Sequence, residues 1–179
     1  MDSRRSGRIA VDPERPPLEM PSPLLNEMCE HALKAFSERQ EECCGLLVGD
    51  AATPFREAHP CRNDMSRHHR RDPFNYPRDA RHAFHMRETD YHRVLREAER
   101  RGLSVTGIYH SHVNAEAYFS ELDQEFASQP LFPFPDAHHV VISVTGEPGT
   151  TPLVIGVGAF RWLPEEGRFE GAPIVAVAP

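Results

Sequence analysis

The sequence predicts an α/β fold in a single domain, with a mixed central β-sheet flanked by helices. Two segments space their apolar residues as helices do, and several short apolar runs are bounded by turn residues. A length of 179 residues suits one domain with a sizeable core. The order of these elements suggests a mixed sheet with two long helices and one short helix.

The helices are predicted from the spacing of apolar residues and from their start and stop signals. Apolar residues recur at helical spacing over residues 25–36, with charged residues on the other face, and Ser22 or Pro23 suits the start. A second helix is expected over residues 77–101, where a glycine follows as its stop. A short helix is expected over residues 120–128.

The strands are predicted from short apolar runs between polar or turn-forming residues. They are expected at residues 43–50, 55–61, 103–110, 138–144, 153–162 and 174–178. Residues 62–77 are expected to form a polar loop with a basic run that contains Arg67, Arg70 and Arg71. This run is interpreted as a solvated loop or, alternatively, as a docking surface for an acidic partner.

The N-terminal end has a different composition from the rest. Residues 1–21 contain four prolines among charged residues and few large apolar groups. Such a segment buries too little surface to offset its ordering entropy, so we expect a disordered tail at residues 1–21 and a domain at residues 22–179.

Charge and cysteine usage limit the function classes. The net charge of −7 argues against a dedicated nucleic-acid binder, which needs a clustered basic surface. No apolar stretch is long enough for a membrane span. The four cysteines show no C-x-x-C spacing, and no apolar segment follows the N-terminal arginines as in a signal peptide. We therefore expect a cytoplasmic location.

A pair of histidines marks the end of the strand at residues 103–110. Because His110 and His112 are two residues apart, their side chains leave the same face of an extended chain, with Cα atoms roughly 6.6 Å apart. Two imidazoles at that spacing can bind one zinc ion. The pair alone is weak, since chance gives about 0.7 such pairs in a chain with this histidine content.

Ser120 and Asp123 strengthen the pair. Asp123 lies one turn into the expected short helix, where its carboxylate can face the strand end. Two imidazoles and one carboxylate leave the fourth tetrahedral position for water, as in catalytic zinc sites. Ser120 with Asp123 is also close to a helix capping box, and the two interpretations are compatible.

Two motifs together resemble a known family. The spacing H-S-H, seven residues, Ser, two residues, Asp is met by His110, Ser111, His112, Ser120 and Asp123. The stretch that begins at Glu42 has the form E-x-C-G-L-L-x-G. Both resemble the JAMM (MPN+, Mov34/JAB) zinc metallopeptidases of the prokaryotic stand-alone type, over about residues 22–162. The resemblance implies a JAB/MPN domain, a fold similar to that of cytidine deaminases.

The resemblance also implies a role for each site residue. His110, His112 and Asp123 would hold one zinc ion per chain, and water activated by it would be the nucleophile. Glu42 would take the proton of that water and deliver it to the leaving amine, while Ser120 would donate to the oxyanion. From the residues alone, Glu41 and Glu42 are equivalent as bases, and only the motif spacing selects Glu42.

Other reactive residues are assigned structural roles. Ser111 should point away from both histidines. His82 and His85 share a face of the expected second helix, but no carboxylate is placed to complete a site. Cys43 and Cys44 are expected to be buried strand residues. A Cys–His nucleophile built from either is a poor alternative, because nothing nearby would lower the pKa of the thiol.

Two residues depart from the usual family pattern. Val113 stands where proline commonly follows the second histidine, and Phe119 stands where proline commonly precedes the serine. Those prolines would stiffen the loop between His112 and Ser120. Their absence affects the expected loop conformation and substrate groove, but no metal ligand is lost.

The function expected from the resemblance is zinc-dependent hydrolysis of a peptide or isopeptide bond after the C-terminal Gly-Gly of a ubiquitin-like or sulfur-carrier protein. The alternative is a non-catalytic MPN-type interaction scaffold, although such relatives typically lack the ligands. Zinc hydrolysis of a small molecule such as a nucleoside is disfavoured by the missing P-C-x-x-C ligand pair.

Overall fold

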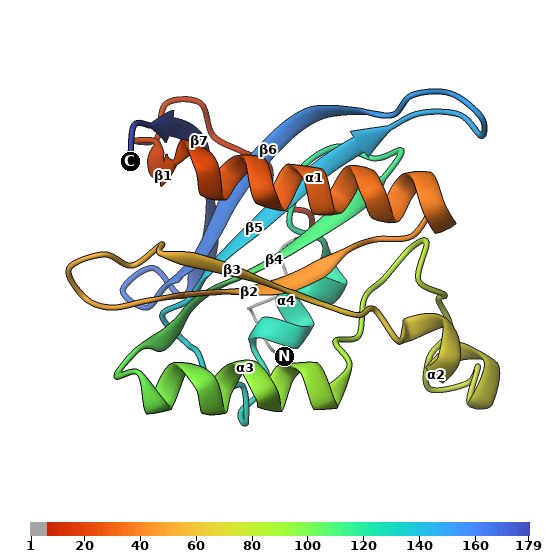
Figure 1. The fold of residues 1–179 in the computed structure, drawn as a ribbon, viewed down its shortest axis with the longest axis horizontal. Coiled ribbons are helices and arrows are strands. Elements are labelled where there is room, and N and C mark those ends of the chain that lie inside the picture. The colour runs from red at the N-terminus through yellow and green to blue at the C-terminus, as the bar shows by residue number, and fades with distance from the viewer. Residues whose placement is uncertain (1–6) are drawn as a thin grey trace.

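A computed structural model describes residues 7–179 (Figure 1). Within them seven strands form one sheet in the order β1-β7-β6-β5-β4-β2-β3. The strands are β1 (Leu18–Pro21), β2 (Cys44–Gly49), β3 (Glu57–Cys61), β4 (Ser104–Val113), β5 (His138–Thr145), β6 (Leu153–Leu163) and β7 (Arg168–Val177). The helices are α1 (Ser22–Arg39), α2 (Met65–Arg71), α3 (Glu88–Arg100) and α4 (Glu121–Ala127).

Strand β4 lies inside the sheet and pairs differently with its two neighbours. It runs antiparallel to β2 and parallel to β5, so that His110 lies beside Cys44 on one side and Val141 on the other. The only other parallel pair in the described chain joins β1 to β7. The expected mixed α/β sheet is thereby confirmed.

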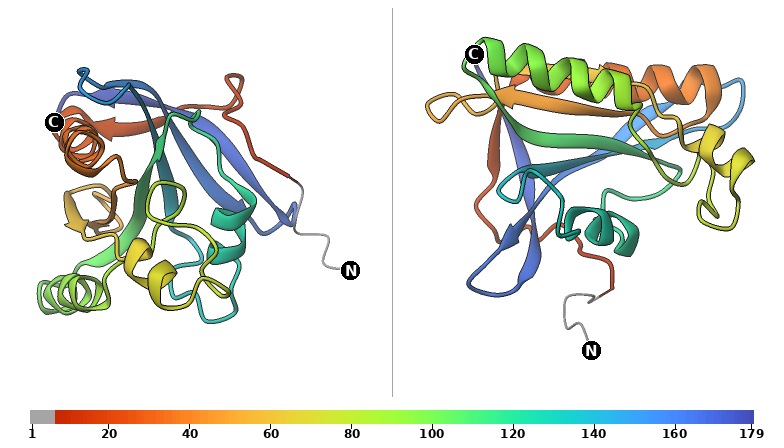
Figure 2. Two further views of the ribbon diagram at one scale, coloured as in Figure 1. Left: turned by 90° about the vertical axis from the view of Figure 1, so that its right-hand side faces the viewer. Right: turned by 90° about the horizontal axis from the view of Figure 1, so that it is seen from below.

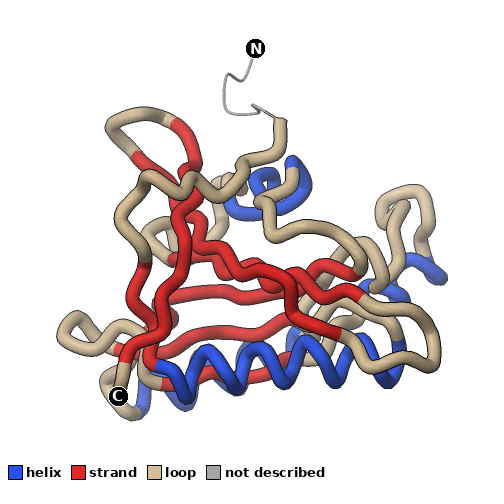
Figure 3. The backbone as a smooth tube through the Cα atoms, turned by 90° about the horizontal axis from the view of Figure 1, so that it is seen from above, coloured by secondary structure: helices blue, strands red, loops and turns tan. Residues whose placement is uncertain are grey.

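The two long helices cover opposite faces of the sheet, as Figures 1 and 2 show. Leu47 and Tyr109 belong to the core beneath α1, which runs along the sheet in Figure 3. Leu46 and Ile108 belong to the core beneath α3. Because successive strand residues alternate between faces, His110 and His112 share the face of Ile108. The sheet therefore presents both histidines on the side that α3 covers.

The expected helix over residues 77–101 is wrong in its first half, because α3 begins only at Glu88. Residues 77–87 form an irregular segment whose backbone is held by a side chain instead. Asn63 donates to the carbonyl of Ala83 at 3.1 Å and accepts from the amide of His85 at 3.0 Å. These bonds compete with helical ones. His82 and His85 therefore do not share a helix face, and the expected polar loop contains α2.

The N-terminal segment also differs from the expected disordered tail. Residues 1–6 of that tail lie outside the described residues. From Gly7 on the chain follows the sheet, and residues 18–21 form β1 beside β7. Ile9 and Val11 pack on a cluster around Phe119 and Phe160, which supplies the apolar burial that composition alone did not indicate. None of the helices in residues 7–179 has the length and apolarity that a membrane crossing requires.

Candidate metal centre

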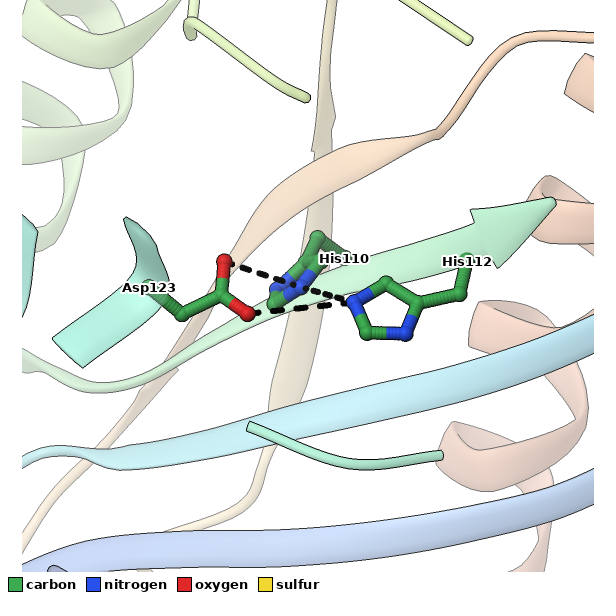
Figure 4. A group of neighbouring side chains, drawn as sticks. All are labelled: His110, His112 and Asp123. Atoms are coloured by element: carbon green, nitrogen blue, oxygen red, sulfur yellow. Dashed lines mark hydrogen bonds and ion pairs between the residues drawn. The ribbon is translucent and has the colours of Figure 1, made fainter. Parts of the chain in front are cut away.

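Three side chains converge where β4 ends and α4 begins (Figure 4). His110 and His112 come from β4, and Asp123 comes from the first turn of α4. All three are buried, and their ligand atoms lie within 4.8 Å of one another. Residues predicted from the histidine pair and the distant aspartate are therefore brought together as expected.

The spacing of the ligand atoms suits a tetrahedral ion. His110 Nε2 lies 3.3 Å from His112 Nε2 and 3.4 Å from Asp123 Oδ1, and His112 Nε2 lies 3.8 Å from Asp123 Oδ2. Donor atoms at ~2.0–2.1 Å around a tetrahedral zinc ion are ~3.3 Å apart. The two separations from His110 Nε2 match this value. The separation from His112 Nε2, which is measured to the other oxygen of Asp123, exceeds it by about 0.5 Å.

The hydrogen bonds of His112 leave the cluster rich in acceptors. Its Nδ1 lies 2.8 Å from the carbonyl oxygen of Glu116, an acceptor that requires Nδ1 to be the donor. In the neutral ring Nε2 then carries a lone pair, directed toward His110 and a carboxylate of Asp123. Nitrogen lone pairs and a carboxylate that are buried together are stabilised by a bound cation. The hydrogen bond to Glu116 orients the His112 ring, as hydrogen bonds to metal-binding histidines do.

Ser120 caps α4 and binds Asp123. Its Oγ accepts from the Asp123 amide at 3.1 Å, and its own amide donates to Asp123 Oδ2 at 2.8 Å, which completes the expected capping box. The Ser120 hydroxyl also lies 2.6 Å from Asp123 Oδ2. Burial alone would raise the pKa of Asp123, but His110 together with these hydrogen bonds lowers it well below its usual value. The carboxylate is therefore ready as a charged ligand.

Glu42 lies in the same cleft, two residues before the start of β2. It is 6% exposed, and its pKa is raised well above the usual value by burial first and by the nearby Asp123 second, against the opposing effect of Arg78. A carboxyl group with a raised pKa is suited to both accept and release a proton. Glu41 does not line this cleft and pairs instead with Arg39 at 3.3 Å. The structure thus separates two glutamates that were equivalent by residue type.

The residues next to Glu42 fix its position. Ser111 Oγ accepts from the amide of Cys43 at 2.8 Å, on the face of β4 opposite the histidines. Asn63 donates to the carbonyl oxygen of Glu42 at 3.0 Å. Cys43 and Cys44 are buried as expected, and burial raises the pKa of Cys43 to about 12, which disfavours a thiolate nucleophile.

The cleft over the cluster has a volume of about 230 Å³. Glu42, His112, Ser120 and Asp123 line it, and a basic wall of Arg78, Arg81 and His82 lies beside them. Asp79 pairs with Arg81 at 2.8 Å and with His82 at 3.4 Å. No described residue forms an ion pair or hydrogen bond with Arg78. Among residues 7–179, Arg78 is therefore a cation of this wall without an ion-pair partner, and it lies close enough to Glu42 to act on its pKa.

The loop between His112 and Ser120 is held by hydrogen bonds in the absence of prolines. Asn114 adopts a left-handed conformation with φ of 52° and donates its amide to Val144 on β5 at 2.8 Å. The carbonyl oxygen of Glu116 accepts the hydrogen bond from His112 Nδ1. Phe119 donates its amide to Ile9 at 2.9 Å, a bond that proline could not form.

Comparison with known proteins identifies the family to which the chain belongs. A family described as prokaryotic homologs of the JAB domain matches residues 21–155. The chain belongs to this family. Two curated relatives named CysO-cysteine peptidase, from Mycobacterium bovis and Mycobacterium tuberculosis, are each 31% identical to this JAB domain over 121 residues. The match covers 67% of this chain and 68% of each relative.

Solved structures share the fold of this JAB domain. The solution structure of a protein from Desulfitobacterium hafniense matches with a TM-score of 0.55 at 19% identity, covering 90% of this chain and 94% of the other. That of a protein from Salinibacter ruber also has a TM-score of 0.55, at 24% identity, with coverage of 90% and 92%. At these identities the likeness supports the architecture alone.

Sequence reasoning assigned no role to several residues around the site of this JAB domain. Asn63 joins the Glu42 backbone to the irregular segment. Arg78 lines the cleft as a cation that no described residue pairs with, and Tyr118 packs on His112 with ring centroids 4.7 Å apart. None of these belongs to a spacing pattern with metal or proton chemistry. Their roles follow from contacts with segments that are distant in the sequence and close in the folded chain.

Proposed function

We propose that this chain is a zinc-dependent metallopeptidase of the JAMM type. It would hydrolyse a peptide or isopeptide bond after the C-terminal Gly-Gly of a ubiquitin-like or sulfur-carrier protein. The observation that carries the proposal is the arrangement of His110, His112 and Asp123 at tetrahedral spacing, with the buried Glu42 in the same cleft. The resemblance in both motifs and the family membership support the same reaction class.

The proposed chemistry divides between the metal and the chain. A zinc ion held by His110, His112 and Asp123 would supply Lewis acidity and a lowered pKa of water. Glu42 takes a proton from the attacking water and passes it to the leaving nitrogen, which its raised pKa favours. Ser120 lines the cleft and donates its hydroxyl hydrogen to the oxyanion that develops at the carbonyl. During this step its hydrogen bond to Asp123 is exchanged for one to substrate.

The size of the two adjoining clefts supports an extended substrate. A larger cleft of about 560 Å³ shares Arg78, Leu122 and Asp123 with the cleft over the metal cluster. An extended chain can therefore pass across the cluster with parts on both sides. A glycine tail fits such a passage because it has no side chains to clash with the walls.

Arg78, with which no residue of the described part of the chain forms an ion pair, favours a short leaving group with a free carboxylate. Arginine binds carboxylates through two parallel hydrogen bonds. The leaving residue would lie near Glu42, since Glu42 must protonate its nitrogen, and Arg78 lines that same cleft. The similarity to proteins named CysO-cysteine peptidase points to the same kind of product, a carrier freed of a small C-terminal residue.

The test is hydrolysis of ubiquitin-fold carriers that end in Gly-Gly followed by cysteine, by a short peptide, or by a lysine-linked conjugate. We expect mass spectrometry to show release of the carrier at Gly-Gly, complete loss of release in chelator, and recovery with added zinc. A purified chain without stoichiometric metal that binds the carriers intact would instead identify an interaction scaffold.

A second comparison addresses the leaving group. Carriers that end in cysteine with a free carboxylate should be cleaved with a KM about tenfold lower than carriers that end in cysteine amide. Arg78→Ala should remove this preference, whereas Arg81→Ala should keep it, because Arg81 is already paired with Asp79. An equal preference in both variants would exclude Arg78 as the carboxylate-binding residue.

A further inference from the structure

The N-terminal strap, residues 7–12, crosses the sheet and reaches the loop that carries Ser120. Ile9 and Phe119 form an isolated antiparallel bridge, in which Ile9 donates to Phe119 at 3.0 Å and accepts from it at 2.9 Å. Asp12 donates its amide to Gly171 on β7 at 3.1 Å. The red segment passes α4 and then follows the blue strands in the right view of Figure 2.

Two glycines of the sheet leave room for this strap. A Cβ atom on Gly171 would lie 2.3 Å from the carbonyl oxygen of Ala10 and 2.7 Å from Cε1 of Phe160. One on Gly158 would lie 2.5 Å from Cγ2 of Val11 and 3.0 Å from Cε2 of Phe160. Neither glycine has the positive φ that would otherwise favour this residue. The strands therefore lack side chains at the positions that the strap crosses, which indicates a specific seat for it.

The strap contacts both sides of the Ser120–Asp123 pair. Phe119 directly precedes Ser120, and Gln124 directly follows Asp123. Gln124 is 2% exposed, and its Nε2 donates to the carbonyl of Gly7 at 2.6 Å. A third contact acts on His112 through Tyr118. The guanidinium of Arg8 lies 4.3 Å from the ring centre of Tyr118, and the Tyr118 ring packs on His112.

We propose that the strap is a positioning element for the active-site loop, residues 113–124, and holds Ser120 and Asp123 in their reactive geometry. In the usual family pattern a proline before the serine would stiffen this loop. In this chain the hydrogen bonds from the strap take over that role. Phe119 can serve as the donor because it is not proline. The kinetic part of this inference rests on the proposed peptidase function, but the ordering of the loop does not.

The decisive variant removes one backbone hydrogen bond. Ile9→Pro deletes the amide that donates to Phe119, and Ile9→Val keeps that amide and most of the apolar contact. We expect amide hydrogen exchange in residues 114–124 to rise about three- to tenfold in Ile9→Pro, with β4 and β5 unchanged. On a cleavable carrier, kcat should fall by a similar factor while KM stays within about twofold. Ile9→Val should resemble the parent chain in both measurements.

Two further variants test the strap without altering its backbone donor. Arg8→Ala removes an exposed side chain over Tyr118 and should lower kcat about threefold. Gly171→Ala should displace the strap and raise loop exchange. The matched control is Gly156→Ala on β6, where an added Cβ meets only Ala117 at 3.8 Å.

The outcomes separate this inference from the proposed function. Equal loop exchange and equal kcat in Ile9→Pro and Ile9→Val would overturn the positioning role. Increased exchange throughout the sheet would also overturn it, since the strap would then support the fold as a whole. A parent chain that binds zinc but cleaves no carrier would refute the peptidase proposal, and the exchange comparison would still decide whether the strap orders the loop.

Discussion

The two halves of the candidate metal centre are held in different ways. His110 and His112 belong to β4, which is hydrogen-bonded on both sides, and Glu42 is tied to this region through Cys43 and Asn63. Asp123 and Ser120 belong to a loop and the first turn of a short helix. Their positions depend on a capping box and on contacts from a segment more than 100 residues away in the chain.

The geometry of the strand half comes from the sheet itself, whereas the geometry of the loop half depends on hydrogen bonds to other segments. In the strand half, the alternation of side chains places two imidazoles on one face without further support. In the loop half, Asp123 is both a proposed metal ligand and a member of the capping box. Changes in the strand half should therefore act on chemistry alone, whereas changes in the loop half should also affect local order.

The largest expected effect is in the loop half. Asp123→Ala removes a charged ligand and should weaken zinc binding more than ~100-fold, since loss of a hydrogen-bonding partner around a ligand alone costs ~10–100-fold. Turnover at stoichiometric zinc should be abolished. Zinc titration with a chelating indicator measures the affinity. Glu121→Ala on the same first turn is the control for helix electrostatics and should bind zinc normally.

Glu42→Gln in the strand half should have the next largest effect. Glutamine keeps the size of the side chain but cannot accept the proton, so kcat should fall by ~10²–10⁴-fold. Zinc content should remain stoichiometric, because Glu42 is not among the converging ligands. Steady-state kinetics and metal analysis together check both statements. Glu41→Gln serves as the control, and a comparable loss of turnover there would contradict the assignment of the base.

Ser120→Ala tests whether the loop half combines two roles. Loss of the oxyanion donor should lower kcat by ~10²-fold with little change in KM. Loss of the cap should also destabilise the chain by ~1 kcal/mol, measured by denaturant unfolding. Ser120→Thr keeps the hydroxyl and should retain most of both. A change confined to stability would leave the cap as the only role of Ser120.

The strand half was predictable from the sequence because its information is local. The H-x-H spacing and the apolar run before it determine which face carries the ligands. Residues 110, 112 and 123 were expected to converge and do so. The capping box at Ser120 was also readable, since it depends on two residues three positions apart.

The parts that were missed depend on contacts between distant segments. Asn63 takes the backbone bonds that a helix over residues 77–87 would have used, and no pattern in those residues reveals it. Ile9 and Val11 are isolated apolar residues in a proline-rich segment. Their partners, Phe119 and Phe160, lie more than 100 residues away. Composition therefore predicted disorder where the structure places a packed strap.

The smallest expected effect concerns His139, which lies where the two halves meet. Its Cα is paired with Ile108 of β4, and its ring contacts Phe119 of the loop with centroids 5.0 Å apart. Burial, followed by the nearby His110, lowers the pKa of His139 to about 3. In the unfolded chain the ordinary value is ~6.5.

The sign of the resulting pH dependence follows from this difference. Above pH ~6.5 the ring is neutral in both states and contributes nothing. As the pH falls below that value the unfolded chain takes up a proton that the folded chain does not bind, so the free energy of unfolding decreases, by about 2 kcal/mol at pH 5.

Denaturant unfolding of the parent chain in chelator at pH 7 and pH 5 measures the total loss. His139→Phe, which matches its aromatic neighbours, should lose about 2 kcal/mol less over this range, while His82→Gln at an exposed position should lose as much as the parent. An equal pH dependence in His139→Phe and the parent would contradict this prediction, because His139 would then be protonated in the folded chain as readily as in the unfolded chain.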